Sequence, residues 1–159
     1  MTTDRATVLL AEDDPDDVLL TQIAFERARL ANPLQVVRDG EEAIAYLKGT
    51  GKFANRAEFP MPSLLLLDLV MPLINGFEVL EWLREQQPGL NSLPVVVLTA
   101  SETIHDIKLA SQLGALSFLV KPIGFKDLHG LSSFLPATLP LANKPQGTPP
   151  APPGASGTA

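Results

Sequence analysis

The chain has 159 residues, of which 45% are hydrophobic, so it is long enough and apolar enough for one domain with a substantial core. Its net charge of −6 at pH 7 and its lack of a basic run argue against binding to nucleic acid or to a membrane surface. The absence of cysteine excludes disulfides and thiolate chemistry, and no segment resembles a signal peptide or membrane span, so a soluble cytoplasmic domain is expected.

Short apolar runs alternate with segments of helical periodicity along the first 135 residues. Asp14 followed by Pro15 is typical of a helix start, whereas Gly49, Pro88 and Gly114 end helical patterns. In chain order, the predicted elements are strand 6–11, helix 15–30, strand 34–38, helix 41–49, strand 63–69, helix 75–87, strand 94–99, helix 103–114, strand 116–120 and helix 124–135.

The predicted strands are apolar along their whole length, which is typical of a parallel sheet that helices cover on both faces. Five strand–helix units indicate an α/β, doubly wound, five-stranded parallel sheet with strand order 2-1-3-4-5. In such folds, ligands bind at the carboxyl ends of the strands. That edge of the sheet is therefore where functional residues are expected.

The last 24 residues, 136–159, include seven prolines, with Gly, Ala and Thr among the rest. This composition cannot bury enough apolar surface to offset the entropy lost on ordering. We therefore expect one globular domain over 1–135 and a disordered, Pro-rich tail over 136–159.

Polar side chains gather at the predicted carboxyl edge: Glu12 and Asp13 after the first strand, then Asp68, Thr99 and Lys121 at the ends of the third, fourth and fifth. Carboxylates crowded into one pocket repel one another unless a cation neutralises them. Mg²⁺ prefers such oxygen ligands and keeps water molecules that a phosphate can replace. A carboxylate nucleophile, a metal, a lysine and a hydroxyl are together the groups that form and hold an aspartyl phosphate.

Each of these residues also has an ordinary structural interpretation when it is taken alone. Asp14, Asp16 and Asp17 begin a helix, where acidic side chains interact favourably with the helix dipole, and we assign them that role. Asp68 could accept hydrogen bonds in a turn, and a lysine before a proline is usually a solvated loop residue. The joint occurrence at the ends of four strands is what favours a functional site.

The segments that carry these residues resemble, as a set, the receiver domains of two-component response regulators. The resemblance covers about residues 6–135 and rests on LLAEDDPDD, LLLLDLVMPLINGFEVL, PVVVLTAS and GALSFLVKPIGF. It implies a flavodoxin-like fold and a phosphoacceptor signalling switch rather than an enzyme, with at most Mg²⁺-dependent self-phosphorylation from small donors and autodephosphorylation.

The resemblance also implies roles for individual residues. Asp68 would be the phosphoacceptor, and Asp13 and Asp68 would bind Mg²⁺. Glu12 would help to hold the metal through water, and the backbone carbonyl of Val70 would complete the protein ligands. Because the Val70 side chain is apolar and borders the path of the hydrolytic water, we expect slow loss of the phosphoryl group.

The same resemblance assigns roles to three further residues, of which Thr99 and Phe118 are the switch residues. Lys121 would pair with the carboxylate or the phosphate, and its peptide bond to Pro122 would be cis. Thr99 would bond a phosphoryl oxygen, and Phe118 would be the aromatic switch residue. An exposed Phe costs more in water than an exposed Tyr, so we expect an inward Phe118 before phosphorylation.

The long loop before the third strand and the segment DGEEAIAYLKG resemble the single-domain regulators that accompany bacterial phytochromes. The implied partner is a sensor histidine kinase, in particular a bacteriophytochrome. No output domain follows the last predicted helix, so the signal would pass through protein contacts, a dimerisation change or onward phosphotransfer, the last including a phosphate-sink role.

The apolar residues near the end of the chain allow two interpretations. They could form a homodimer interface at the C-terminal helix region, or they could pack into the domain's own core. The residues concerned are Leu128, Leu131, Phe134, Leu135, Leu139 and Leu141.

Other classes of function fit the sequence less well. An aspartate-nucleophile phosphohydrolase would carry a second Asp two residues after the first, where this chain has Val70. A flavodoxin-like cofactor binder needs amide-rich Gly, Ser and Thr after the first strand, but residues 12–15 are Glu-Asp-Asp-Pro. A receiver used only as an interaction module would not need the full set of site residues.

Overall fold

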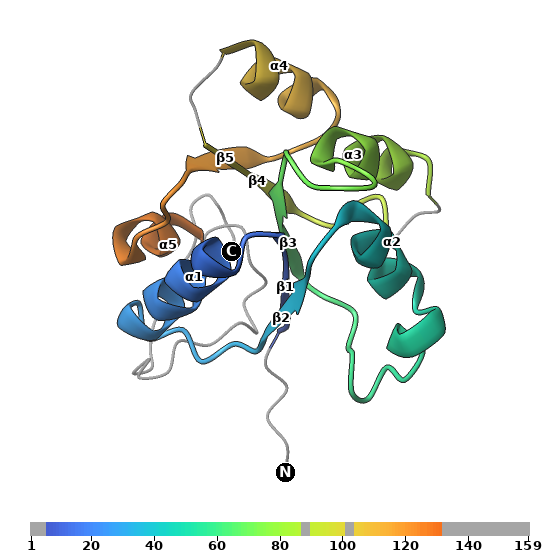
Figure 1. Cartoon of the computed structure of the whole chain (residues 1–159), viewed down its shortest axis with the longest axis horizontal. Helices are drawn as coiled ribbons and strands as arrows, with labels where there is room; N and C mark the ends of the chain where they lie inside the picture. Colours follow the sequence, from blue (N-terminus) through green and yellow to red (C-terminus); the bar gives the residue numbers. More distant parts are fainter. Residues whose placement is uncertain (1–5, 87–89, 101–103, 132–159) are drawn as a thin grey trace, which may run out of the picture.

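The computed structural model describes residues 6–86, 90–100 and 104–131. Five parallel strands form one sheet in the order β2-β1-β3-β4-β5 (Figure 1), which confirms the predicted topology. The strands are β1 (Val8–Ala11), β2 (Leu34–Val37), β3 (Leu64–Asp68), β4 (Val95–Thr99) and β5 (Ser117–Val120).

Helices cover both faces of the sheet. Helices α1 (Pro15–Arg27) and α5 (Phe125–Leu131) lie on one face, and α2 (Gly40–Lys48), α3 (Gly76–Arg84) and α4 (Ile104–Gln112) lie on the other (Figure 1). Alternate residues of β3 supply two separate cores: Leu65 and Leu67 pack with α2 and α3, whereas Leu64 and Leu66 pack with α1 and α5. Burial on both faces explains why this strand is leucine at consecutive positions rather than alternating apolar and polar.

Capping residues set the starts of the helices at the carboxyl edge. Asp14 and Asp39 accept hydrogen bonds from backbone N–H groups of α1 and α2, and Asn75 forms a capping box with Glu78 on α3. The first helix is shorter than the predicted 15–30, because Arg29 adopts a positive φ of 60° that cannot continue a helix.

The loop between α2 and β3 has a structure of its own that the sequence did not predict. It contains the short 3-10 helix η1 (Gly51–Phe53), and the rings of Tyr46, Phe53 and Phe59 pack with their centroids 5.1–6.0 Å apart. The Tyr46 hydroxyl donates to the Pro60 carbonyl at 2.8 Å. The aromatic cluster therefore fastens the loop to α2.

The C-terminal leucines that the structure describes belong to the core. Leu128 and Leu131 on α5 are 1% and 2% exposed and pack against the sheet and α1, so these two offer no surface to a partner. The other four apolar residues of that set, the end of the predicted last helix and the whole of 136–159 lie outside the described residues. Within the described part of the chain, no helix is long and apolar enough to cross a membrane.

Candidate functional site

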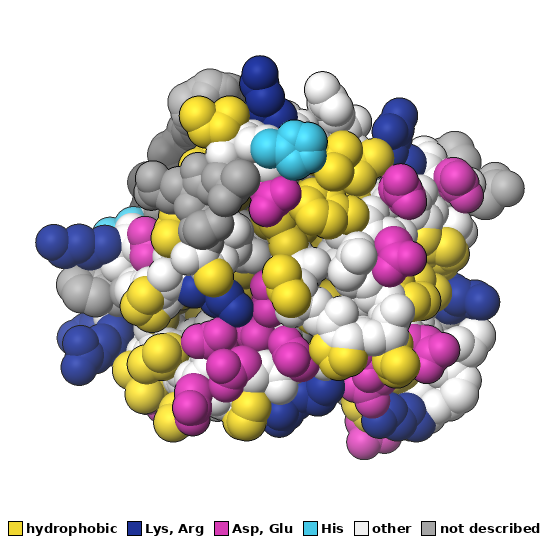
Figure 2. Space-filling model, turned by 45° about the horizontal axis from the view of Figure 1, so that its top comes forward, with side chains coloured by type: hydrophobic (Ala, Val, Ile, Leu, Met, Phe, Trp, Pro, Cys, Tyr) yellow, Lys and Arg dark blue, Asp and Glu magenta, His cyan; other side chains and the backbone are white. Residues whose placement is uncertain are grey.

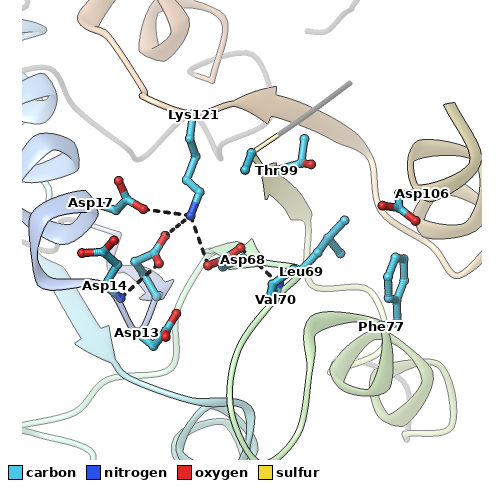
Figure 3. A pocket seen from close by; sticks show the side chains of 12 residues that line it. Asp13, Asp14, Asp17, Asp68, Leu69, Val70, Phe77, Thr99, Asp106 and Lys121 are labelled. Atoms are coloured by element: carbon cyan, nitrogen blue, oxygen red, sulfur yellow. Dashed lines mark hydrogen bonds and ion pairs between the residues drawn. The ribbon is translucent and has the colours of Figure 1, made fainter. Parts of the chain in front are cut away.

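Five side chains predicted from the sequence meet at the carboxyl edge of the sheet, around a pocket of about 320 Å³ (Figure 3). They reach it from β1, β3, β4 and the loop after β5, because parallel strands end at the same edge. These residues are Glu12, Asp13, Asp68, Thr99 and Lys121. Acidic side chains gather around a hollow on this face of the molecule, with a basic side chain among them (Figure 2).

Lys121 is the electrostatic centre of the pocket. Its Nζ donates to Asp17 Oδ2 at 2.9 Å, to Glu12 Oε1 at 3.1 Å and to Asp68 Oδ2 at 3.2 Å (Figure 3). Burial by itself would lower the pKa of Lys121, but the hydrogen bonds that Lys121 donates to Asp17 and Glu12 and the charges of the nearby carboxylates outweigh it and raise the pKa above its ordinary value. Lys121 is therefore a cation at physiological pH.

Glu12 is almost fully buried, with 1% of its surface exposed. Its Oε1 accepts from Lys121, and its Oε2 accepts from the Asp14 backbone N–H at 3.2 Å. Burial and the adjacent Asp68 raise the pKa of Glu12 to about 7, because both oppose a second negative charge at this place. Glu12 therefore binds a proton more readily than an exposed glutamate does.

Glu12, Asp13 and Asp68 each offer one carboxylate oxygen, and these atoms lie within 4.8 Å of one another. An all-oxygen set with two buried members and one exposed member fits a hard divalent cation, which can neutralise the carboxylates and keep water on its open side. The backbone N–H of Val70 donates to Asp68 Oδ1 at 3.2 Å, which orients the carboxylate. The Val70 side chain is 80% exposed at the mouth of the pocket.

The loop that carries Val70 is held by two backbone contacts. Gly76 donates from its N–H to the Leu69 carbonyl at 3.0 Å, and a side chain at Gly76 would collide with the Asp68 carbonyl. Ile74 donates to the Pro72 carbonyl at 2.8 Å across Leu73, whose φ is 69°. Backbone hydrogen bonds within the loop therefore fix the conformation of the segment that follows Asp68.

The two switch candidates lie apart from each other. Thr99 is 5% exposed and lines the main pocket. Phe118 is 38% exposed and lines a second pocket of about 260 Å³ between α4 and β5, with Ile107 and Ser111. The expectation of an inward Phe118 is therefore wrong for this structure, because its side chain is partly exposed and lines the pocket beside α4 rather than the main pocket. The peptide bond between Lys121 and Pro122 is cis, as the resemblance implied.

The structure adds one residue to the site that sequence reasoning assigned only to a helix end. Asp17 begins α1, as predicted, but its carboxylate also makes the shortest of the three contacts with Lys121. Asp106 and Phe77 line the pocket as well. Nothing in the local pattern marks Asp17, because an acidic residue in a first helical turn is common for electrostatic reasons.

Comparison with known proteins gives one family. The response regulator receiver domain model matches residues 8–132. Response regulator Rcp1 of Synechocystis sp. is 36% identical over 138 residues, which cover 84% of this chain and 91% of Rcp1. The solved structure of the Mn²⁺-bound form of Rcp1 has a TM-score of 0.69 at 36% identity and covers 83% of this chain and 99% of that one.

Two other solved structures of response regulators are also similar to this chain. The bacteriophytochrome response regulator RtBRR is 39% identical with a TM-score of 0.76, over 89% of this chain and 84% of RtBRR. The phosphorylated cyanobacterial phytochrome response regulator RcpA is 33% identical with a TM-score of 0.72, over 86% of this chain and 98% of RcpA. With its sheet order, its carboxylate group and the lysine beside it, the chain belongs to the response regulator receiver domain family.

Proposed function

We propose that this protein is a stand-alone response regulator, in which Asp68 accepts a phosphoryl group from the phosphohistidine of a sensor kinase. The observation that carries the proposal is the geometry of Asp68: a buried carboxylate that lies 3.2 Å from a lysine, shares a ligand set with two other carboxylates and faces an open pocket. A bond forms between an Asp68 oxygen and phosphorus as the bond from phosphorus to the histidine nitrogen breaks, and the electron pair of that bond remains on the imidazole.

Each side chain of the site has a part in this step. Lys121 neutralises the charge on the transferred group, and Thr99 offers a hydroxyl to one of its oxygens. Asp13 and Asp68 would hold Mg²⁺ directly, Glu12 would help to hold it through water, and the backbone carbonyl of Val70 would complete the protein ligands. When bound, Mg²⁺ neutralises the carboxylates and the phosphoryl oxygens. The protein supplies position and charge, and therefore acts as a switch rather than as an enzyme with turnover on a substrate.

The partner proposed for this chain is a sensor histidine kinase of the bacteriophytochrome type. The support is the similarity to RtBRR, Rcp1 and RcpA, two of which are described as phytochrome response regulators. The proposed output is a change of conformation that signals through contacts with a downstream protein; onward phosphotransfer and dimerisation at the C-terminal helix region are the alternatives. The receiver domain is proposed to end at residue 135, with 136–159 as its tail.

An intact-mass measurement tests the central proposal. Incubation with acetyl phosphate and Mg²⁺ is expected to add one phosphoryl group to the protein, and the adduct is expected to be absent without Mg²⁺. Asp68→Asn keeps the shape of the side chain and removes the nucleophile, so it is expected to gain no mass. Glu58→Gln, an exposed carboxylate outside the pocket, is the matched control and is expected to be phosphorylated normally.

A histidine kinase donor separates two possible failures of that experiment. If acetyl phosphate and a purified bacteriophytochrome kinase both leave the mass unchanged after rapid acid quenching, Asp68 is not a phosphoacceptor and the proposal is wrong. Size-exclusion chromatography with and without the adduct then tests dimerisation. An unchanged elution volume at micromolar concentrations would count against a dimer as the output.

A further inference from the structure

Lys121 has three carboxylate partners, and they differ in what else they do. Glu12 and Asp68 belong to the group of carboxylates that can hold a metal ion, and Asp68 is also the proposed phosphoacceptor. Asp17 lies outside that group, although its contact with Nζ, at 2.9 Å, is the shortest of the three. A lysine ammonium has three protons to donate, so these three contacts use its full capacity.

Asp17 is held firmly enough to serve as an anchor. It lies in the first turn of α1, and the N-cap residue Asp14 accepts a hydrogen bond from the Asp16 N–H at 2.9 Å. The carbonyl of Asp17 accepts from the buried Thr21 hydroxyl at 2.9 Å. The Asp17 side chain is only 23% exposed, so its interaction with Lys121 is partly shielded from water. α1 therefore presents the Asp17 carboxylate to the ammonium of Lys121, which enters the pocket from the loop after β5 (Figure 3).

An acidic residue near a helix N-terminus does not by itself indicate this role. Asp16 occupies the same first turn and interacts with the same dipole, but its side chain is exposed and, among the residues that the structure describes, it forms no ion pair. What distinguishes Asp17 from Asp16 is the contact with Lys121. Asp16 can therefore serve as the control for Asp17, because its substitution removes the same helix-dipole interaction without removing a contact with Lys121.

The entry of a phosphoryl group changes the other two contacts of Lys121 but not this one. One oxygen of Asp68 would become part of the acyl phosphate, and Glu12 would face a bound cation, so both carboxylates would attract the Lys121 ammonium less strongly. Asp17 belongs neither to the proposed phosphoacceptor nor to the carboxylate group that can hold a metal ion. It can therefore keep Lys121 extended across the pocket while the charge in the centre changes.

We propose that Asp17 is a positioning residue for phosphoryl transfer, which acts by holding the Lys121 ammonium where the transferred group arrives. The proposal deepens the function proposed above and rests on it. Without Asp17, the charge of Lys121 is shared by Glu12 and Asp68 alone. The ammonium then moves toward the nucleophile and the metal ligands, and the ordered side chain gains rotamer freedom.

The test is the rate of mass gain with acetyl phosphate at saturating Mg²⁺, with saturation established separately for each variant. Asp17→Ala is expected to be phosphorylated roughly tenfold more slowly than the wild type, the scale of losing one hydrogen bond between charged groups. Asp16→Ala removes the same kind of charge from the same helical turn and is expected to match the wild type within about twofold. Asp17→Glu restores a carboxylate that can reach Nζ and is expected to recover at least half of the lost rate.

A fold check and a replacement variant keep the outcome decisive. Urea unfolding and circular dichroism establish that each variant is folded; if Asp17→Ala is not, Asp17→Asn keeps the shape without the charge and takes its place. A wild-type protein that gains no phosphoryl group contradicts the proposed function itself. A wild type that is phosphorylated, with Asp17→Ala as fast as Asp16→Ala or with Asp17→Glu as slow as Asp17→Ala, overturns the role of Asp17 alone.

Discussion

A carboxylate can end a strand of consecutive leucines only where its charge is compensated. Asp68 is 3% exposed, and an isolated ionised carboxylate at that depth would cost several kcal/mol. Lys121 and the Val70 N–H provide the compensation at 3.2 Å each. The same contacts leave Asp68 on the wall of an open pocket, so stability and reactivity come from one arrangement.

Glu12 is expected to make metal binding depend on pH near neutrality. Its pKa is raised from 4.5 to about 7 in the folded chain, and a protonated Glu12 lacks the negative charge that would attract the hydrated cation. The apparent Mg²⁺ affinity should therefore fall as the pH is lowered from about 8 to 6, by up to tenfold per unit below the pKa. Isothermal titration calorimetry at several pH values measures this, with Glu12→Gln as the variant that should flatten the profile.

The raised pKa of Glu12 also determines how the stability of the metal-free protein depends on pH. The proton binds more tightly to folded than to unfolded Glu12, so this contribution is fully present below about pH 4.5 and is lost as the pH rises through about 7. Mg²⁺ should oppose that loss. A wild-type affinity that does not change between pH 6 and 8 would contradict the assignment.

At the scale of elements, α2 and the loop after β3 touch backbone to backbone. A Cβ at Gly40, the first residue of α2, would collide with the Ile74 carbonyl. Gly40→Ala is therefore expected to push this loop away from α2, lowering the free energy of unfolding by about 1–3 kcal/mol and slowing phosphorylation of Asp68. Urea unfolding gives the first effect and the mass assay gives the second.

Gly124→Ala is the matched control for that change. A Cβ at Gly124 would meet its nearest neighbour, Asp127 Oδ2, at 3.8 Å, which is an ordinary contact. We expect this variant to unfold within about 0.5 kcal/mol of the wild type. If Gly40→Ala were equally neutral, the close approach of the two elements would not constrain the site.

The loop between α2 and β3 depends on one buried hydroxyl. Burial raises the pKa of Tyr46 to about 12, so the hydroxyl stays protonated and donates to the Pro60 carbonyl. Tyr46→Phe keeps the aromatic cluster and removes this bond, which should lower the free energy of unfolding by about 1 kcal/mol. Urea denaturation measures the change, and hydrogen exchange should locate it in residues 49–62. Exchange that rises uniformly over the domain instead would show that the bond is not specific to the loop.

At the scale of the whole molecule, the sheet with a core on each face accounts for the stability that the chain needs. We therefore expect that removal of residues 136–159 leaves both the urea midpoint and the slope of unfolding unchanged, because a Pro-rich segment of this composition exposes little new surface when it is lost. A smaller slope in the truncated protein would mean that the tail buries surface on the domain.

The sequence by itself determined the five strands, their order and the five principal site residues, because these depend on local patterns and on one topological rule. Uniformly apolar runs identify buried parallel strands, and the ends of such strands converge. The packed loop after α2 and the outward Phe118 were decided by tertiary structure. So was the contact between Asp17 and Lys121, which joins residues 104 positions apart. Periodicity describes neighbours along one element, whereas contacts of this kind arise only when two elements pack together.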